Sequence, residues 1–351
     1  MMMTSRKHDP LDYVRPNIRA LKPYSTARDE FKGGDISIWL DANENPYPDT
    51  GLNRYPDPRH RRLKQSIGRL KGVAPDCVFI GGAGSDEAID LVYRIFCVPG
   101  RDNVVAAAPT YGVYAVAADI NDVEYREVAP AADLTYTAAD LLAATDSRTK
   151  VIWICSPDNP TGISLPLSEI ETVAREFDGI VAVDEAYIDF STQPSALTLL
   201  ARYPNLIVLQ TFSKARGMAS LRIGMAFATP SIAAIFANVK YPYNINGPTQ
   251  ERLLAMIDRD ITAQVAEIRE QREWLRGSLD ALSCVEKVYP SDANFLLVKF
   301  DDADKVYDYL VSQGILVRNR NRVAHCRGCL RITVGTPDEN HALVNALKRI
   351  L

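Results

Sequence analysis

The sequence lacks an apolar run long enough to cross a membrane, and it lacks an excess of charge of either sign. A transmembrane helix needs about 20 consecutive apolar residues. The first residues, MMMTSRKHDPLDYVRP, also contain no apolar core of signal-peptide length. The 40 Lys and Arg residues nearly balance 44 Asp and Glu, which gives a formal net charge of −4. Such a chain has no general attraction to nucleic acid or membranes, and we predict a cytoplasmic protein.

Cysteine is scarce and scattered, with 6 residues in the whole chain. Cys326 and Cys329 have CxxC spacing, and His325 lies beside them. A lone CxxC without a second ligand pair is weak support for zinc. Reduced thiols of a cytosolic protein fit better, so no metal site is predicted.

The sequence also lacks the two common nucleotide-binding patterns, GxxxxGK[ST] and GxGxxG. It has instead a glycine-rich turn, residues 81–85, between a predicted strand and a predicted helix. Ser85 is expected to cap that helix. Backbone N–H groups and the helix dipole at such a turn favour a phosphate or another anion. Taken alone, the turn has a second interpretation as a simple tight turn.

The chain has 351 residues, 47% of them hydrophobic, which is enough for two domains. Short apolar runs alternate with helix-like segments, and this predicts an α/β fold with a mostly parallel sheet between helices. A further run, residues 223–228, follows its neighbour after a short loop and should be antiparallel. We divide the chain into an N-terminal arm (1–35) that packs with the small domain, a large domain (36–245) and a small C-terminal α/β domain (246–351). The expected elements are strands at 36–40, 78–80, 103–107, 151–155, 180–183, 206–209, 294–300, 315–318 and 330–334, with helices around 63–70, 85–96, 111–120, 248–282 (one or two helices), 302–313 and 337–350.

Polar residues that could take part in catalysis or ligand binding follow three of these strands. Asn159 lies in the rigid loop SPDNPTG, Asp184 ends the run VAVD three residues before Tyr187, and Lys214 follows LIVLQTFS. Ligands in open α/β sheets bind at the carboxyl ends of strands. Spacing alone leaves a purely structural alternative for each residue. In these alternatives Asn159 shapes a turn, Asp184 caps a turn, and Lys214 is a solvated loop lysine.

The combination is more informative than any single residue. Partial burial beside cations would lower the pKa of Lys214 and make its amine a nucleophile. A buried Asp184 needs a charged partner, and a protonated pyridine nitrogen is one. A covalent lysine, an acid for the ring nitrogen and donors for a phosphate are what pyridoxal 5'-phosphate (PLP) requires.

Several motifs extend this argument over nearly the whole chain. They are NPTG (159–162), DEAY (184–187), SKARGMASLRIG (213–224), RALKPYSTAR (19–28), LDANENPYP (40–48), LNRYPDP (52–58), GAGSDE (82–87), PTYGVY (109–114), VDEAYIDF (183–190) and GCLRITVGT (328–336). In this order they resemble the fold-type I, class II PLP-dependent aminotransferases. Within that family the chain most resembles the branch that acts on histidinol phosphate.

The resemblance implies a role for each matching residue. Lys214 would attach the cofactor, Asp184 would pair with its pyridine nitrogen, and Tyr187 would contact its ring oxygen together with Asn159. The expected phosphate ligands are Ala83, Gly84, Ser85, Ser213 and Arg222, with Tyr111 stacked on the ring and Tyr55 reaching the partner subunit's cofactor in a homodimer with shared active sites. The expected substrate-binding residues are Arg331, Arg318, Tyr24 and Asn43.

The implied reaction is an amino transfer in histidine biosynthesis that proceeds in two half-reactions. Glutamate gives its amino group to the cofactor and leaves as 2-oxoglutarate; imidazole-acetol phosphate then receives it and becomes histidinol phosphate. Alternatives within the fold are an aromatic amino-acid aminotransferase and a threonine-phosphate decarboxylase. Outside it are a non-enzymatic binding module and a nucleotide-binding protein. The lysine motif departs from the family pattern at Arg216, which adds a charge near the site, and at Ser220, where the family usually has glycine. The basic segment 319–328 leaves open which arginine reaches the substrate phosphate.

Overall fold

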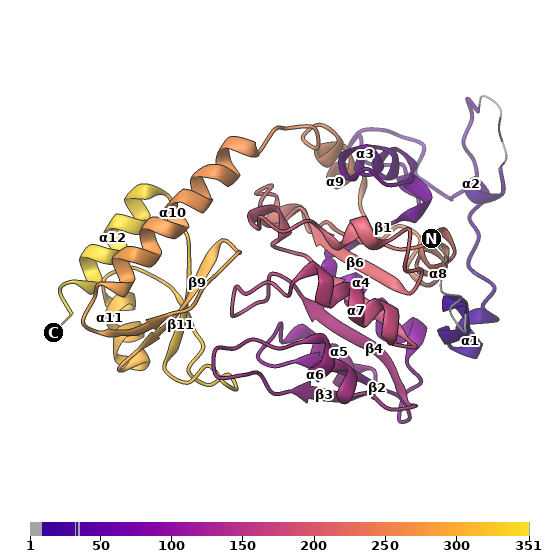
Figure 1. Ribbon diagram of the computed structural model, residues 1–351. Coiled ribbons are helices and arrows are strands. Elements are labelled where there is room, and N and C mark those ends of the chain that lie inside the picture. The colour runs from indigo at the N-terminus through magenta and orange to yellow at the C-terminus, as the bar shows by residue number, and fades with distance from the viewer. Residues whose placement is uncertain (1–8, 32, 34–35, 351) are drawn as a thin grey trace.

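The computed structural model describes residues 9–31, 33 and 36–350, and these form two sheets covered by helices (Figure 1). Within them the larger sheet has seven strands in the order β1-β7-β6-β5-β4-β2-β3. Neighbouring strands are parallel except β7, which is antiparallel to both β6 and β1, as expected for residues 223–228. The strands are β1 (Val78–Gly84), β2 (Asn103–Ala107), β3 (Glu124–Val128), β4 (Thr149–Cys155), β5 (Ile180–Asp184), β6 (Leu206–Thr211) and β7 (Gly224–Phe227).

Alternate residues of the central strands enter two different cores, because successive side chains of a strand point to opposite faces. Val181 and Val183 of β5 belong to one core, and Ile180 and Ala182 to the other. Residues of α3 (Arg61–Lys71), α6 (Ala138–Ala143), α7 (Leu167–Glu176) and α9 (Gly247–Leu254) cover the first face. Residues of α4 (Ser85–Phe96), α5 (Val113–Ile120) and α8 (Pro230–Val239) cover the second. The sheet is therefore buried on both sides, as its apolar strands predict.

The smaller sheet is antiparallel, in the order β10-β11-β9-β8. Its strands are β8 (Val285–Val288), β9 (Phe295–Phe300), β10 (Arg318–Asn319) and β11 (Cys329–Thr333), and its helices are α10 (Thr262–Asp280), α11 (Ala303–Ser312) and α12 (Pro337–Leu347). The amphipathic stretch 248–282 is two helices, α9 and α10, and Figure 1 shows the chain passing through them from the larger sheet to the smaller one. The described residues thus contain an α/β unit on each side of this connection.

The N-terminal segment forms three short helices, η1 (Pro10–Tyr13), α1 (Pro16–Arg19) and α2 (Ala27–Glu30). Val14 is buried in the core beneath α4, and the backbone N–H of Arg15 donates to the carbonyl of Ile95. Residues 1–8, 32, 34 and 35 of the predicted arm lie outside the described residues. The packing of the arm with the small domain and the domain boundaries at 35 and 245 stay predictions.

The expected strand at residues 36–40 is wrong. The segment has no regular structure, and Ile38 and Leu40 are 74% and 89% exposed. A strand is stable only when its backbone pairs with a neighbour, and no described strand pairs with this one. The apolar alternation that suggested a strand therefore produces an exposed apolar surface instead.

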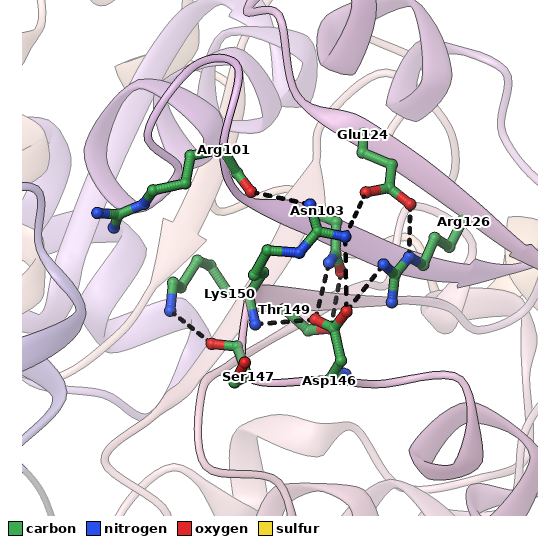
Figure 2. A network of polar contacts seen from close by, with 9 residues as sticks. Arg101, Asn103, Glu124, Arg126, Asp146, Ser147, Thr149 and Lys150 are labelled. Carbon is green, nitrogen blue, oxygen red and sulfur yellow. Dashed lines mark hydrogen bonds and ion pairs between the residues drawn. The ribbon is translucent and has the colours of Figure 1, made fainter.

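Two strands of high polarity, β3 and β8, were not expected from the sequence. β3 (EYREV) is an edge strand that pairs with β2 along its whole length, and its Arg126 forms ion pairs with Glu124 at 2.7 Å and Asp146 at 2.9 Å (Figure 2). Hydrogen bonds from Asn103 and the contact with Arg126 keep the pKa of Asp146 well below its usual range. Polar edge strands avoid pairing with other molecules, which explains why an apolar pattern could not reveal them. The predicted strand 315–318 is also shifted, since β10 covers only Arg318 and Asn319.

All six cysteines are unpaired with one another. Cys326 and Cys329 are buried with Leu297 and Tyr289, and burial raises the pKa values of their thiols to about 12 and about 11. The described residues contain no cluster of His, Cys, Asp and Glu suited to a metal ion. Nor does any helix in that part of the chain have the length and apolarity to span a bilayer.

Candidate active site

One cavity of about 410 Å³ collects the loops that follow five strands of the larger sheet. Its other wall comes from the smaller sheet. The lining residues are Gly84, Ser85, Asp86, Tyr111, Cys155, Asn159, Asp184, Ala186, Tyr187, Thr211, Ser213, Lys214, Ala219, Arg222, Arg318, Arg320 and Arg331. The strand-end residues predicted to converge therefore do so, at the carboxyl edge of the sheet as open α/β folds place ligands.

The glycine turn forms one end of this cavity and lies tightly against Arg222. Gly84 has a φ of 77°, and its backbone N–H donates to the carbonyl of Arg222 at 2.8 Å. The guanidinium of Arg222 donates in turn to the carbonyl of Ala83 at 3.0 Å. The φ of 77° and ψ of −161° at Gly84 form a backbone conformation that essentially only glycine adopts, and a Cβ there would lie 2.8 Å from that guanidinium. The turn and Arg222 thus form one unit at the start of α4.

Ser85 does not cap α4 as expected. Gly84 occupies the cap position and Ser85 is the first helical residue, because the backbone of Gly84 leaves the helical region. The first N–H groups of a helix have no partner within it, and the helix dipole makes that end electropositive. A phosphate-binding role at this position therefore depends on the backbone and hydroxyl of Ser85 and not on capping.

Asp184 ends β5 and is 2% exposed. The hydroxyl of Tyr114 donates to its carboxylate at 2.9 Å, and the backbone N–H of Ala186 donates at 3.1 Å. Burial raises the pKa of Asp184 to about 6 despite these donors. The indole of Trp153 stacks on the Tyr114 ring with centroids 4.8 Å apart, which fixes the hydroxyl beneath the carboxylate.

Lys214 follows β6 and faces the cavity. Its Nζ lies 5.4 Å from the ring centroid of Tyr187. Burial of its amine, followed by the positive charge of Arg331, lowers the pKa of Lys214, and the charge of Asp184 opposes this shift. The direction agrees with the prediction from the sequence. Ser213 is held beside it, since its backbone N–H donates to the Thr211 hydroxyl at 3.0 Å.

Asn159 links the two sheets across the cavity. Its side-chain amide donates to the hydroxyl of Tyr187 at 3.4 Å, and its oxygen accepts a hydrogen bond from the guanidinium of Arg331. Arg331 also lies over the Phe295 ring, 5.2 Å from its centroid. The structure therefore brings two predicted cofactor residues, Asn159 and Tyr187, and a predicted substrate arginine, Arg331, into one hydrogen-bonded group.

Two residues in this site were not singled out from the sequence. Asp86 accepts a hydrogen bond from the hydroxyl of Tyr111 at 3.1 Å and lies 3.8 Å from the guanidinium of Arg222. Tyr114 supports Asp184 as described above. A signal for Tyr114 was present, because it is the last residue of the motif PTYGVY (109–114) that contributes to the family resemblance.

Arg216 does not point into the cavity. Its guanidinium donates to the carbonyls of Ile257 at 2.8 Å and Arg259 at 3.2 Å. These carbonyls belong to the connection between α9 and α10. Arg216 therefore ties the loop that carries Lys214 to the chain that joins the two sheets.

Three predicted site residues lie away from this cavity in the single chain. Tyr55 and Asn43 line another cavity, of about 890 Å³, where the Tyr55 ring stacks on Tyr243 with centroids 4.5 Å apart. Tyr24 lines a third, next to Pro58. Their predicted roles at the cofactor and substrate stay predictions, since no partner chain is present.

The charges of the cavity fit the expected ligand chemistry. Lys214, Arg222, Arg318, Arg320 and Arg331 face only two acids, Asp86 and Asp184. An anionic group such as a phosphate would neutralise the cations around the glycine turn. A protonated ring nitrogen would neutralise Asp184, whose burial without a cation is costly. The residues present thus fit pyridoxal phosphate.

Comparison with known proteins agrees with this geometry. The profile of the family described as aminotransferase class I and II matches residues 30–347. The histidinol-phosphate aminotransferase of Bacteroides thetaiotaomicron is 53% identical over 340 residues, covering 96% of this chain and 98% of that protein. The protein of the same name from Parabacteroides distasonis is 52% identical over 344 residues, covering 97% of this chain and 99% of its own length.

Solved structures share the fold. The crystal structure of a histidinol-phosphate aminotransferase from Clostridium acetobutylicum has a TM-score of 0.78 at 22% identity, covering 86% of this chain and 91% of that one. A Sinorhizobium meliloti histidinol-phosphate aminotransferase in complex with pyridoxal-5'-phosphate has a TM-score of 0.76 at 26% identity, covering 86% of this chain and 84% of that one.

Proposed function

The chain belongs to the class I and II aminotransferases, and on that premise we propose that it transfers an amino group between glutamate and imidazole-acetol phosphate. The products are 2-oxoglutarate and histidinol phosphate, as in histidine biosynthesis, and the compartment is the cytoplasm. The observation that carries the proposal is the cavity in which Lys214 and Asp184 meet Arg331. The proposal is also supported by a relative named as a histidinol-phosphate aminotransferase, which is 53% identical over nearly the full length of both chains.

The proposed cofactor is pyridoxal phosphate, attached through Nζ of Lys214. Ala83, Gly84, Ser85, Ser213 and Arg222 would hold its phosphate, Asp184 its ring nitrogen, Asn159 and Tyr187 its ring oxygen, and Tyr111 its ring face. When bound, this cofactor supplies an electron sink that stabilises the negative charge left on a substrate carbon after loss of a proton.

Three side chains would then act on the substrate and on the proton. Nζ of Lys214, once the amino group of the substrate has displaced it from the cofactor, would take a proton from the substrate α-carbon in one half-reaction and deliver a proton to that carbon in the other, a role that its lowered pKa favours. Asp184 stays ionised beside a cationic nitrogen and keeps the proton there. Arg331 binds the distal anion of either substrate, because its planar guanidinium matches carboxylate and phosphate bidentately.

The complete site is proposed to need a homodimer. Tyr55, Tyr24 and Asn43 lie outside the cavity of their own chain. The segment between Tyr24 and Asn43 exposes Ile38 and Leu40. Large exposed apolar patches commonly mark protein interfaces. A second subunit would cover them and bring Tyr55 to the partner's cofactor phosphate.

Lys214→Ala tests the function directly. The visible absorption band of the wild-type enzyme should bleach with glutamate and return with imidazole-acetol phosphate. Borohydride reduction should leave the cofactor attached to the peptide that contains Lys214, as found by mass spectrometry. The variant should lose both properties with an unchanged circular dichroism spectrum, while Lys348→Ala, at an exposed lysine, should keep them.

Other outcomes would redirect the assignment. A turnover-competent Lys214→Ala would rule out the catalytic role of this lysine. Amino transfer from phenylalanine but not from histidinol phosphate would indicate an aromatic aminotransferase. Release of CO2 from threonine phosphate would indicate a decarboxylase of the same fold.

A further inference from the structure

Three arginines stand on one face of the two-stranded ribbon formed by β10 and β11. Arg318 lies directly opposite Arg331 in the antiparallel register. Arg320 follows Arg318 by two residues, and its backbone N–H donates to the carbonyl of Cys329 at 2.9 Å, which extends the pairing beyond β10. Side chains two residues apart on a strand share a face. All three guanidinium groups accordingly line the active-site cavity.

This arrangement is unfavourable without an anion. Like charges directly opposite one another destabilise a sheet. Burial, followed by repulsion from Arg331 and Arg318, lowers the pKa of Arg320. Among the described residues, none of the three arginines has a carboxylate within ion-pair distance. Nε of Arg320 is buried without an acceptor in the described part of the chain, and the residue lines the cavity.

Arg320 differs in this respect from the other arginines of the basic segment 319–328. Arg322 and Arg327 are exposed and do not line the cavity. Only one of the segment's three arginines is therefore placed to contact a substrate.

The two proposed substrates differ at the end that these arginines would bind. A phosphate ester carries a charge near −2 and three terminal oxygens at neutral pH. A side-chain carboxylate carries a charge of −1 and two oxygens, which one guanidinium can satisfy bidentately. Arg331 alone is thus sufficient for the carboxylate, whereas a phosphate has oxygens and charge left for further guanidinium groups.

We propose that Arg320 is a specificity-determining residue that binds the phosphate of the phosphorylated substrate and contributes little to binding of the dicarboxylate. The inference rests on the proposed aminotransfer between these two substrates. In this assignment Arg331 serves both substrates, and Arg320 serves one. The basic segment therefore supplies the distinction between the two half-reactions.

The test measures equilibrium binding to the cofactor-loaded enzyme. With the cofactor in its aldehyde form, imidazole-acetol phosphate and 2-oxoglutarate cannot receive an amino group, so titration calorimetry reports binding without turnover. Arg320→Gln should weaken binding of imidazole-acetol phosphate about 10-fold or more, as expected for loss of a hydrogen-bonded charge pair. Binding of 2-oxoglutarate should change by less than about 3-fold, since one guanidinium satisfies a carboxylate.

Three further variants separate the possible causes. Arg327→Gln removes an equal charge from the same segment and should leave both affinities unchanged. Arg331→Leu should weaken the binding of both ligands. Arg320→Lys should restore part of the phosphate affinity, because it keeps the charge without the planar fork.

The proposal would be overturned if Arg320→Gln weakened binding of both ligands equally, or if it changed the affinity for neither. A thermal unfolding curve like that of the wild type shows that the variant is folded. Failure of the proposed function is distinguishable, because the wild-type enzyme itself would then fail to bind imidazole-acetol phosphate.

Discussion

His60 is a buried titratable residue outside the active site. It is 1% exposed, and its φ of 52° lies in the left-handed region. Burial, followed by repulsion from Lys240, lowers its pKa from 6.5 to about 3. The native protein therefore keeps this imidazole neutral at pH values where the unfolded chain protonates it.

His60→Asn should make the protein less sensitive to mild acid. Between pH 6.5 and about 3 the unfolded chain binds a proton that the native chain excludes, so His60 reduces stability as the pH falls. At pH 5 the difference amounts to about 2 kcal/mol. Asparagine tolerates a positive φ, so the variant should fold.

Urea unfolding at pH 7.5 and pH 5 measures this effect. The loss of free energy of unfolding between the two pH values should be smaller in His60→Asn than in the wild type. His325→Asn is the matched control, because His325 also has a positive φ, 61°, but is exposed. Equal losses in wild type and His60→Asn would contradict the shifted pKa.

At this scale the sequence predicted the residues that follow apolar strands and belong to ordered motifs. Lys214 and Asp184 were identified in this way and Arg331 by the family resemblance, and all three line the cavity. Asp86 and Tyr114 were not singled out, because their importance comes from hydrogen bonds that α4 and α5 form only after they pack on the sheet. Arg216 was expected to add charge near the site, yet its guanidinium reaches carbonyls of a distant segment.

Among the elements, β7 and the start of α4 are in unusually close contact. A Cβ on Gly224, the first residue of β7, would lie 2.1 Å from the backbone nitrogen of Ser85. Real atoms do not approach this closely, so the turn at residues 84–85 depends on the missing side chain.

Gly224→Ala should separate the turn from β7. We expect a loss of about 2 kcal/mol or more in the free energy of unfolding, as for overpacked cores, and weaker retention of the cofactor. Gly277→Ala is the control, since Gly277 lies in α10 with open space around it. There alanine should stabilise the protein by up to about 1 kcal/mol. Denaturant unfolding of both variants measures these changes. A free energy of unfolding in Gly224→Ala equal to that of the wild type would contradict the close contact.

Helices and strands were predictable where apolar periodicity was strong, whereas strands of polar sequence were not. The parallel strands at 103–107, 151–155 and 180–183 and the antiparallel strand near 223–228 were all located from the sequence. β3 was missed because its sequence is polar, and its position depends on backbone pairing with β2 that the sequence pattern does not reveal. The segment 36–40 has a strand-like pattern, but its apolar side chains are exposed in the single chain.

For the whole molecule, that exposed segment leads to a prediction about assembly. Leu40→Glu should convert the proposed homodimer to a monomer, because burial of a charge at an apolar interface is costly. Sedimentation velocity should show this change together with loss of activity, as Tyr55 would no longer reach a partner's site.

Val311→Glu provides the comparison, since Val311 is 47% exposed but lies on α11, beside the smaller sheet. It should remain dimeric and active. A wild-type protein that sediments as a monomer at micromolar concentration would refute the shared site. The sequence alone could suggest the dimer only by family resemblance, because exposure of residues 36–40 becomes visible in the folded chain.

The cysteines, described above as unpaired, also have a practical consequence. Four of the six are buried, whereas Cys77 and Cys284 are partly accessible. Cys77 directly precedes β1 of the larger sheet, and Cys284 directly precedes β8 of the smaller one. Thiol-reactive dyes therefore have two favoured attachment points, one beside each sheet, in the unaltered sequence. Energy transfer between such dyes would report the distance between the two sheets in solution, with and without substrate, and needs no engineered substitution.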